Sequence, residues 1–320
     1  MACVLLIVCL LWSITLGAAD IDANIVFDAL FRYDNTQFNR LIIQTVRLPR
    51  VLAGALVGAA LAVAGAIMQG LTRNPLADSG ILGINAGAAF AVVLAAWTLG
   101  NPPLSTYAVA ALTGAAVAAV LVYGLGSVGR GGATPLRLTL AGVILTAFVS
   151  AMTTAILIRD QETLDQIRFW TAGSLAGREM PLVIQTVPII FAGIIGSLLI
   201  SRQITTISLG EDVAKGLGQN TLVVKIIAAV MVVLLAGGAV SLAGPIGFVG
   251  LIIPHIARFV AGVDYRWIIP YSAVLGAVMV TVADVAARIV LRPQELPVGI
   301  MMAIVGAPFF IYLARWKVRR

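Results

Sequence analysis

The sequence predicts an all-α integral membrane protein with about ten transmembrane helices. Of its 320 residues, 60% are hydrophobic and only 11% are charged, whereas a soluble domain carries roughly a quarter charged residues. The few charges lie between long apolar runs, and a helix needs about 20 apolar residues to cross a bilayer core. This composition argues against a soluble enzyme, a disordered chain or a disulfide scaffold. The basic residues are dispersed between the runs, so they do not indicate a nucleic-acid site.

Two apolar runs are long enough for two crossings each and must be divided. Asn101-Pro102-Pro103 divides the first and Gly244-Pro245 the second, because Pro and Gly interrupt helices. The predicted spans are 1–19, 51–71, 80–99, 105–126, 138–158, 180–201, 224–243, 246–263, 267–285 and 297–314. Ten crossings put both termini on one side of the membrane. A cytoplasmic N-terminus places more Lys and Arg in the inner segments and is therefore favoured, with the opposite orientation as the alternative.

The first span has a second interpretation. Residues 1–19 are apolar and end in Gly17-Ala18-Ala19, as a cleaved signal peptide could. They lack the basic start of a signal peptide, which favours a retained helix. Cys3 and Cys9 lie six residues apart and face different directions on a helix, so no disulfide is expected.

The sequence contains no recognisable catalytic or cofactor site. The phosphate-binding loop G-x-x-x-x-G-K-[ST] is absent, and Lys occurs only at 215, 225 and 317. His255 is the single His, and no metal-ligand spacing is present. We therefore expect a transport subunit rather than an enzyme, with any ATP bound by another chain.

Asp284 is the only acidic residue near the interior of a predicted span. Membrane carriers driven by protons or sodium usually place ionisable residues there. Arg288 follows four residues later, and an i,i+4 ion pair is the simpler interpretation. An ion-coupled secondary carrier remains the alternative class.

Three segments resemble one known family. The first is Arg47-Leu-Pro-Arg50 followed by residues 51–88, and the second is LGEDVAKGLG at 209–218. The third comprises AGPIGFVGLIIPHIAR at 243–258, ADVAARIV at 283–290 and ELPVGIMMAIVGAPFFIYL at 295–313. Together they resemble the FecCD-type membrane permeases of ABC importers for iron–siderophores, haem and vitamin B12. The resemblance covers almost the whole chain from about residue 40.

This resemblance implies a type II ABC importer permease fold, with residues 1–320 as a single transmembrane permease domain. Such permeases pair to form a pore, dock two ATPases on the cytoplasmic face, and receive substrate from a periplasmic or lipid-anchored binding protein. It also implies that ATP and Mg are bound by the ATPase and that the permease lies in the bacterial plasma (inner) membrane. A ferric siderophore is the favoured substrate; haem and vitamin B12 are the alternatives. Whether two copies pair, or this chain and a related permease, stays open.

The segment 208–220 lies between the sixth and seventh spans. It predicts a short helix with Glu211 and Asp212 at its positive N-terminus, followed by a reversal at Gly216 and Gly218. In similar permeases this segment couples the membrane domain to the ATPase; the alternative is an ordinary capped loop helix. The resemblance assigns this role to Leu209, Gly210, Glu211, Asp212, Ala214, Gly216 and Gly218.

Arg47 and Arg50 can share one helical face, and Pro49 suits the first turn of the second span. Arg288 lies near the outer end of the ninth span. In similar permeases, arginines at these three positions meet acidic residues of the binding protein. The alternatives are snorkelling to the interface and local pairing with Asp284.

Asn74-Pro75-Leu76 follows the second span at its inner end. Pro75 cannot continue the helix. In the family this turn contributes to the cytoplasmic gate, so Asn74, Pro75 and Leu76 are gate candidates; a simple helix stop is the alternative.

The outer segment 159–179 has Leu164, Ile167 and Trp170 at helical spacing. It predicts a short helix over the outer pore mouth. His255, near the inner end of the eighth span, is expected to pack rather than to bind substrate.

Overall fold

The computed structural model describes residues 2–16, 41–100, 102–128, 134–291 and 294–317. Within them, ten apolar helices fall on the ten predicted spans. They are α1 (Ala2–Thr15), α4 (Leu48–Thr72), α5 (Ile84–Leu99), α6 (Leu104–Ser127), α7 (Pro135–Arg159), α9 (Met180–Leu199), α12 (Thr221–Ala243), α13 (Val249–Ala261), α14 (Tyr265–Ile289) and α15 (Val298–Lys317). Residues 1 and 17–19 of the first predicted span, and Asn101, lie outside the described residues.

Shorter helical segments connect the ten helices. They are the π-helical turn η1 (Ile43–Arg47), the 3₁₀ helix η2 (Ser79–Leu82), and the helices α8 (Gln161–Thr171), α10 (Ser201–Leu209) and α11 (Glu211–Gly216). The sequence predicts α8 and α11 but not α10, whose residues we expected to form a loop. The predicted second span begins too late, at residue 51. In the structure, η1 extends the N-terminal end of α4 to Ile43.

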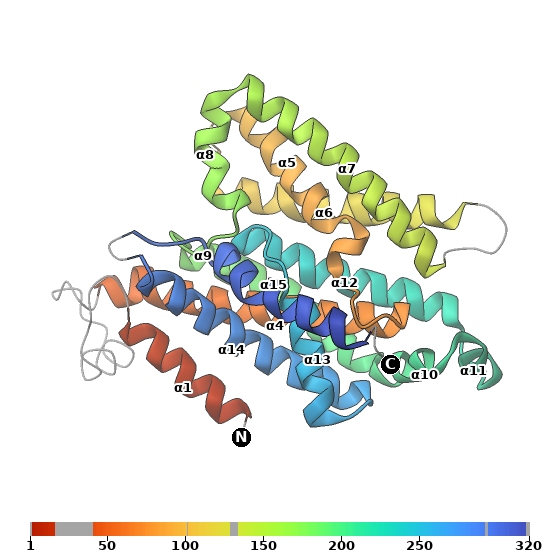
Figure 1. The fold of residues 1–320 in the computed structure, drawn as a ribbon. Coiled ribbons are helices and arrows are strands. Elements are labelled where there is room, and N and C mark those ends of the chain that lie inside the picture. The colour runs from red at the N-terminus through yellow and green to blue at the C-terminus, as the bar shows by residue number, and fades with distance from the viewer. Residues whose placement is uncertain (1, 17–40, 101, 129–133, 292–293, 318–320) are drawn as a thin grey trace.

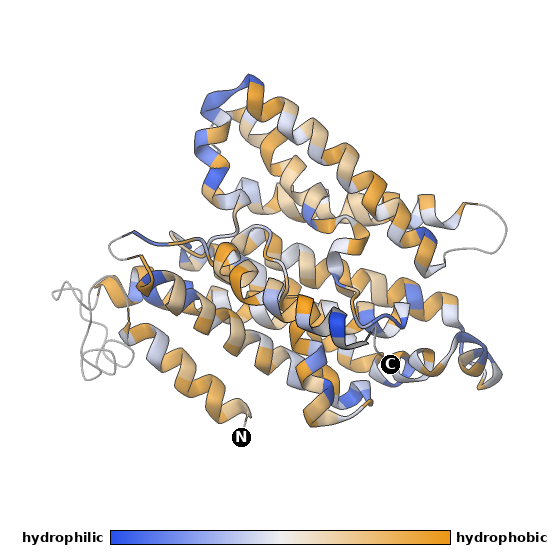
Figure 2. Ribbon diagram, viewed as in Figure 1, coloured by the Kyte–Doolittle hydropathy of each residue, from blue (hydrophilic) through white to orange (hydrophobic). Residues whose placement is uncertain are grey.

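The helices suit a membrane by length and composition. Six of the described helices are long and apolar enough to cross a bilayer, and α1, α5, α13 and the apolar part of α15 are shorter. Figure 2 shows hydrophobic residues along the helix bodies and hydrophilic residues gathered mainly toward helix ends and connections. This pattern confirms the all-helical membrane fold with about ten spans.

Helix α4 is the centre of the larger helix group. It contacts α14, α12, α13 and α9. In the continuous helix Ile43–Thr72, 83% of the most apolar 18-residue stretch is buried. Figure 1 shows α4 surrounded by these helices, with α1 on the far side of α14. Small residues make this burial possible, because they let helix backbones approach closely.

Two glycine contacts set the position of α4. A Cβ atom on Gly58 would lie 2.1 Å from the carbonyl oxygen of Gly276 on α14. A Cβ atom on Gly65 would lie 2.2 Å from the carbonyl oxygen of Gly250 on α13. Both distances are far below van der Waals contact, so only glycine fits at these crossings.

A second group contains α5, α6, α7 and α8 (Figure 1). α5 packs against α6 and α7, and Gly87 of α5 meets Gly114 of α6 as closely as the glycines of α4 meet theirs. Only 11% of the most apolar 18-residue stretch of α7 is buried. This helix therefore presents an apolar surface to its surroundings.

The chain after α8 connects both groups through its backbone. The Ser174 amide donates to the Ala243 carbonyl at the end of α12 (2.8 Å), and the Gly299 amide of α15 donates to Gly173 (2.9 Å). Gly244 adopts a φ of 74° and lies so close to Trp170 that a Cβ would be 2.1 Å from its carbonyl oxygen. We call the end of the molecule that holds this junction and the start of α4 the predicted outer end.

Replacing Gly58 by Val should destabilise the protein, because the added atoms collide with the α14 backbone, which cannot move aside. Overpacking of this kind costs about 1–3 kcal/mol, which thermal unfolding in detergent should report as a lowered midpoint. Gly124→Ala on α6 is the control, because nothing lies within 4 Å of the added Cβ. Equal midpoints for the two variants would contradict the packing assigned to Gly58.

Candidate functional site

The three arginines predicted to face a binding protein lie together at the predicted outer end. Arg47 and Arg50 belong to the η1–α4 helix, and Arg288 belongs to α14. All three are buried, with exposed fractions of 6%, 7% and 3% respectively. Their guanidinium groups point into contacts between helices.

Asp284 is the centre of a buried ion-pair network. Its carboxylate accepts from Arg50 Nη2 at 2.9 Å and pairs with Arg288 Nη2 at 2.8 Å. Arg50 Nη1 also binds Glu295 Oε2 at 2.6 Å. Two carboxylates thus offset two guanidinium charges, as burial of charge requires.

The same cluster holds the end of α1. Arg47 Nη1 donates to the carbonyl oxygens of Ile14 (2.7 Å) and Thr15 (2.9 Å). Arg288 Nη1 donates to those of Ser13 (3.1 Å) and Leu16 (2.8 Å). The last carbonyls of a helix have no partner inside it and carry negative partial charge. The arginines therefore cap α1 and join it to α4 and α14.

This geometry confirms the local pairing of Arg288 with Asp284 that the i,i+4 spacing indicates. It differs from an arrangement in which all three guanidinium groups stand free at the surface. Contact of Arg47, Arg50 and Arg288 with a binding protein stays a prediction. Such contact would have to compete with the bonds made inside this chain.

The segment 208–220 contains α11, which follows α10 after a sharp turn at Gly210 (φ 144°). Glu211 and Asp212 occupy the first turn of α11, as predicted. Gly218 adopts a φ of 78° and reverses the chain, whereas Gly216 ends α11 with no positive φ. The expectation that both glycines make the reversal is therefore wrong for Gly216.

Glu211 ties α11 to the start of α12. Its carboxylate binds Lys225 Nζ at 2.7 Å and Lys215 Nζ at 3.4 Å, and accepts from Thr221 Oγ1 at 3.2 Å. The hydrogen bond from Lys225 is the main reason that the pKa of Glu211 lies below its ordinary value. The resulting stabilisation is present at neutral pH and is lost as the pH falls through that lowered pKa.

The opposite side of the segment exposes apolar side chains. Leu209, Val213 and Leu217 are 67%, 48% and 71% exposed. Ala214 is fully buried instead and packs with Ile207 and Val224. The segment 208–220 is thus fixed through Glu211 and Ala214, and it leaves three apolar side chains uncovered.

The predicted gate turn lies at the other end of α4 from Arg50. α4 ends at Thr72, and Arg73 takes a left-handed conformation (φ 51°) before Pro75 is reached. Asn74 Oδ1 accepts from the Leu76 amide at 3.0 Å, and the Asn74 carbonyl accepts from the Ala77 amide at 3.1 Å. A tight, internally bonded turn therefore carries the half-exposed Leu76.

The structure brings this turn and the segment 208–220 together. Leu71, in the last turn of α4, packs against the cluster of Ile207, Ala214 and Val224. A Cβ on Gly210 would lie 4.0 Å from Arg73 Nη1. The segment thus contacts the helix end that leads directly into Asn74-Pro75-Leu76.

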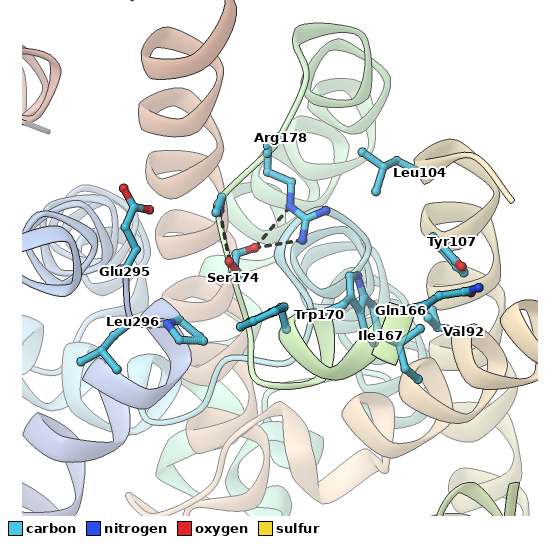
Figure 3. A pocket seen from close by; sticks show the side chains of 14 residues that line it. Val92, Leu104, Tyr107, Gln166, Ile167, Trp170, Ser174, Arg178, Glu295 and Leu296 are labelled. Atoms are coloured by element: carbon cyan, nitrogen blue, oxygen red, sulfur yellow. Dashed lines mark hydrogen bonds between the residues drawn. The ribbon is translucent and has the colours of Figure 1, made fainter. Parts of the chain in front are cut away.

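A cavity of about 470 Å³ lies at the predicted outer end, between α5–α6, α8 and the start of α15. Figure 3 shows Arg178 and Trp170 in the middle of its lining, with Glu295 and Leu296 on one side and Gln166 and Tyr107 on the other. Arg178 is 7% exposed. Burial lowers its pKa to about 10, so it stays protonated at neutral pH.

The sequence analysis predicted neither this cavity nor the polar contacts of Gln69. Arg178 is one charge among several in the segment 159–179, and nothing in the sequence separates it from the others. Gln69, a lone amide within the second span, donates to the Gly250 carbonyl (3.0 Å) and accepts from Arg258. The position of this polar Gln69 side chain inside an apolar run could have indicated the contact.

His255 packs as predicted. Its ring makes edge-on contacts with Phe259 and Phe309, with centroid distances of 5.1 and 6.3 Å. Among the described residues, no group of three or more His, Cys, Asp or Glu is arranged to hold a metal ion.

Comparison with known proteins identifies the family. The model of the FecCD transport family matches residues 5–316. The iron(3+)-hydroxamate import system permease protein FhuB of Bacillus subtilis is 51% identical, over 95% of this chain and 79% of that protein. The ferric enterobactin transport system permease protein FepD of Escherichia coli is 41% identical, over 98% and 94% of the two chains.

A solved structure supports the same assignment. The inward-facing structure of a metal-chelate type ABC transporter superposes with a TM-score of 0.86 and 28% identity, covering 98% of this chain and 97% of that one. The expectation of a transport subunit, rather than an enzyme, is confirmed by these matches. The chain is therefore a multi-pass membrane permease that belongs to the FecCD transport family, as the three sequence segments predicted.

Proposed function

We propose that this permease moves a ferric-siderophore-type chelate from a binding protein into the bacterial cytoplasm by alternating access. Residues 1–320 act as one transmembrane permease domain with both termini in the cytoplasm. The observation that carries the proposal is the contact between the segment 208–220 and the end of α4. The names of its hydroxamate and enterobactin relatives support a ferric chelate as cargo.

The proposed coupling runs from the ATPase to the gate turn in two contacts. An ATPase grips the apolar surface of Leu209, Val213 and Leu217. Movement of α11 then reaches Leu71 through the buried Ala214. Because Asn74-Pro75-Leu76 follows one residue after α4 ends at Thr72, its position changes with that of the helix end.

The partners follow from this mechanism. Two ATPase subunits bind ATP and Mg, and the permease itself binds no cofactor. A second permease, either a copy or a relative, completes the pore, and a periplasmic or lipid-anchored binding protein delivers the chelate at the outer end.

The surroundings of Asp284 argue against the ion-coupled alternative. The buried Arg50 and Arg288 share the Asp284 carboxylate, and breaking a buried ion pair by removing one partner costs about 3–5 kcal/mol. A carboxylate engaged by two arginines of its own chain is better explained as a structural group than as an ion-coupling site.

The test uses proteoliposomes that contain the permease, its ATPase and its binding protein. Uptake of ferric hydroxamate should require ATP on the side of the membrane that the ATPase faces. Omitting the ATPase should abolish uptake, and neither a proton nor a sodium gradient should restore it. Uptake without the ATPase would contradict the proposal. Haem and cobalamin in the same assay distinguish the alternative cargoes.

Leu217→Ser should weaken the ATPase–permease complex by about tenfold or more, because burying one Leu side chain stabilises a contact by about 1.5–3 kcal/mol. Co-purification and the dissociation constant measure this loss. Lys215→Gln is the control in the same segment, since its side chain is 58% exposed and its ion pair with Glu211 is long, at 3.4 Å. Equal binding by wild type and Leu217→Ser would show that this surface is not the dock.

Glu295→Gln should strengthen docking of the binding protein, by up to about tenfold at low salt, if Arg50 meets an acidic partner there. The substitution removes the charge that now holds Arg50 Nη1, and the gain should shrink as added salt screens the pair. Glu179→Gln, an exposed change in the neighbouring outer segment, should leave the dissociation constant unchanged. An unchanged dissociation constant in Glu295→Gln would show that Arg50 has a purely structural role.

A further inference from the structure

Arg178 is a buried charge with no counter-ion in the part of the chain that the structure describes. Its Nε and Nη2 both donate to the Ser174 carbonyl, at 3.2 and 3.0 Å, and among the described residues no other acceptor contacts the guanidinium. Charged residues are rarely this buried unless they are paired. The Nη1 amino group therefore has hydrogen-bonding capacity that the described residues leave unused.

The cavity contains one carboxylate, and that carboxylate is already engaged. Glu295 binds Arg50 at 2.6 Å and makes no ion pair with Arg178 within the described residues. Within the described lining, the positive charge of Arg178 is thus uncompensated, whereas Arg50 is paired twice.

Two further polar atoms in the same lining lack partners. The Tyr107 hydroxyl and Gln166 Oε1 are buried and make no hydrogen bond in the described structure. Buried polar groups are nearly always bonded. Three residues with unsatisfied groups, from α6, α8 and the segment before α9, therefore line one cavity.

The remaining lining suits a larger molecule than an inorganic anion. Leu104 and Trp170 contribute apolar surface, and about 470 Å³ lies within the usual range of small-molecule sites. A guanidinium recognises carboxylate-like oxygens through its planar donors.

We propose that this cavity is a subsite for an anionic oxygen group on the translocated chelate, with Arg178 as the counter-charge. The proposal rests on the proposed function, because it takes the chelate to be the cargo. The phosphate of a lipid headgroup offers the same oxygen chemistry, so the experiment separates the two sources.

The test uses the purified permease–ATPase complex in detergent. The probes are the ferric complexes of N-acetyl- and N-succinyl-desferrioxamine, which share the iron-binding hydroxamates and differ by one carboxylate. Binding is followed by quenching of tryptophan fluorescence, and the quenching lost in Trp170→Phe reports on this cavity. The measured quantity is the ratio of the two dissociation constants.

Wild type should bind the succinyl complex about tenfold more tightly, which corresponds to about 1.4 kcal/mol. Arg178→Gln should bring the ratio close to one, and Arg178→Lys, which keeps the charge, should retain part of the preference. Arg168→Gln is the matched control, because Arg168 is a 59% exposed arginine of α8 and should leave the ratio unchanged.

Three results would overturn the subsite: no preference in wild type, an unchanged preference in Arg178→Gln, or displacement of the succinyl complex by phosphatidylglycerol added to the micelles. The last result would assign the cavity to a lipid headgroup. ATP-driven uptake in proteoliposomes is measured separately. Its failure with the preference intact would contradict the proposed function and leave the anion subsite standing.

Discussion

Helix α4 crosses α14 and α13 at points where the two backbones touch. In a bilayer, lipid tails are as apolar as the side chains, so water cannot drive helices together and close packing must do so. Gly58 and Gly65 allow α4 to approach Gly276 and Gly250 to distances that a single methyl group would prevent. α12 and α9 also pack on α4. These crossings therefore position the helices that carry the segment 208–220 and the ion-pair network around Asp284.

The second organising interaction is electrostatic and lies at one end of that frame. Asp284 draws Arg50 and Arg288 into the space between α4 and α14, and Arg47 and Arg288 bind the final carbonyls of α1. Each charge is costly to bury alone: Arg50 pairs with Asp284 across two helices, Arg288 pairs with Asp284 within α14, and Arg47 binds carbonyl groups of α1. The cluster therefore makes α1 part of the bundle through polar contacts, in addition to the small apolar cluster around Ile14.

The sequence predicted the order and number of the apolar helices because the bilayer imposes a length that hydropathy reports directly. It also predicted the acidic start of α11 and the stop after α4, since Glu211, Asp212 and Pro75 act locally. It could not predict α10, whose apolar residues are too few for a span. It gave no sign that Leu71 packs against the cluster that contains Ala214, that Glu295 binds Arg50, or that Arg178 lines a cavity. These contacts join residues far apart in the chain, and only the packed structure brings them together.

One feature of α4 links the two ends of the molecule. Its 25 residues form an unbroken helix, which at 1.5 Å per residue is about 38 Å long. Arg50 lies at one end and Leu71 at the other, and the glycine crossings lie between them. A helix held at its middle behaves as a lever: a tilt about the crossings displaces its ends in opposite directions. The polar cluster at one end of α4 and the predicted gate turn at the other are thus mechanically one part.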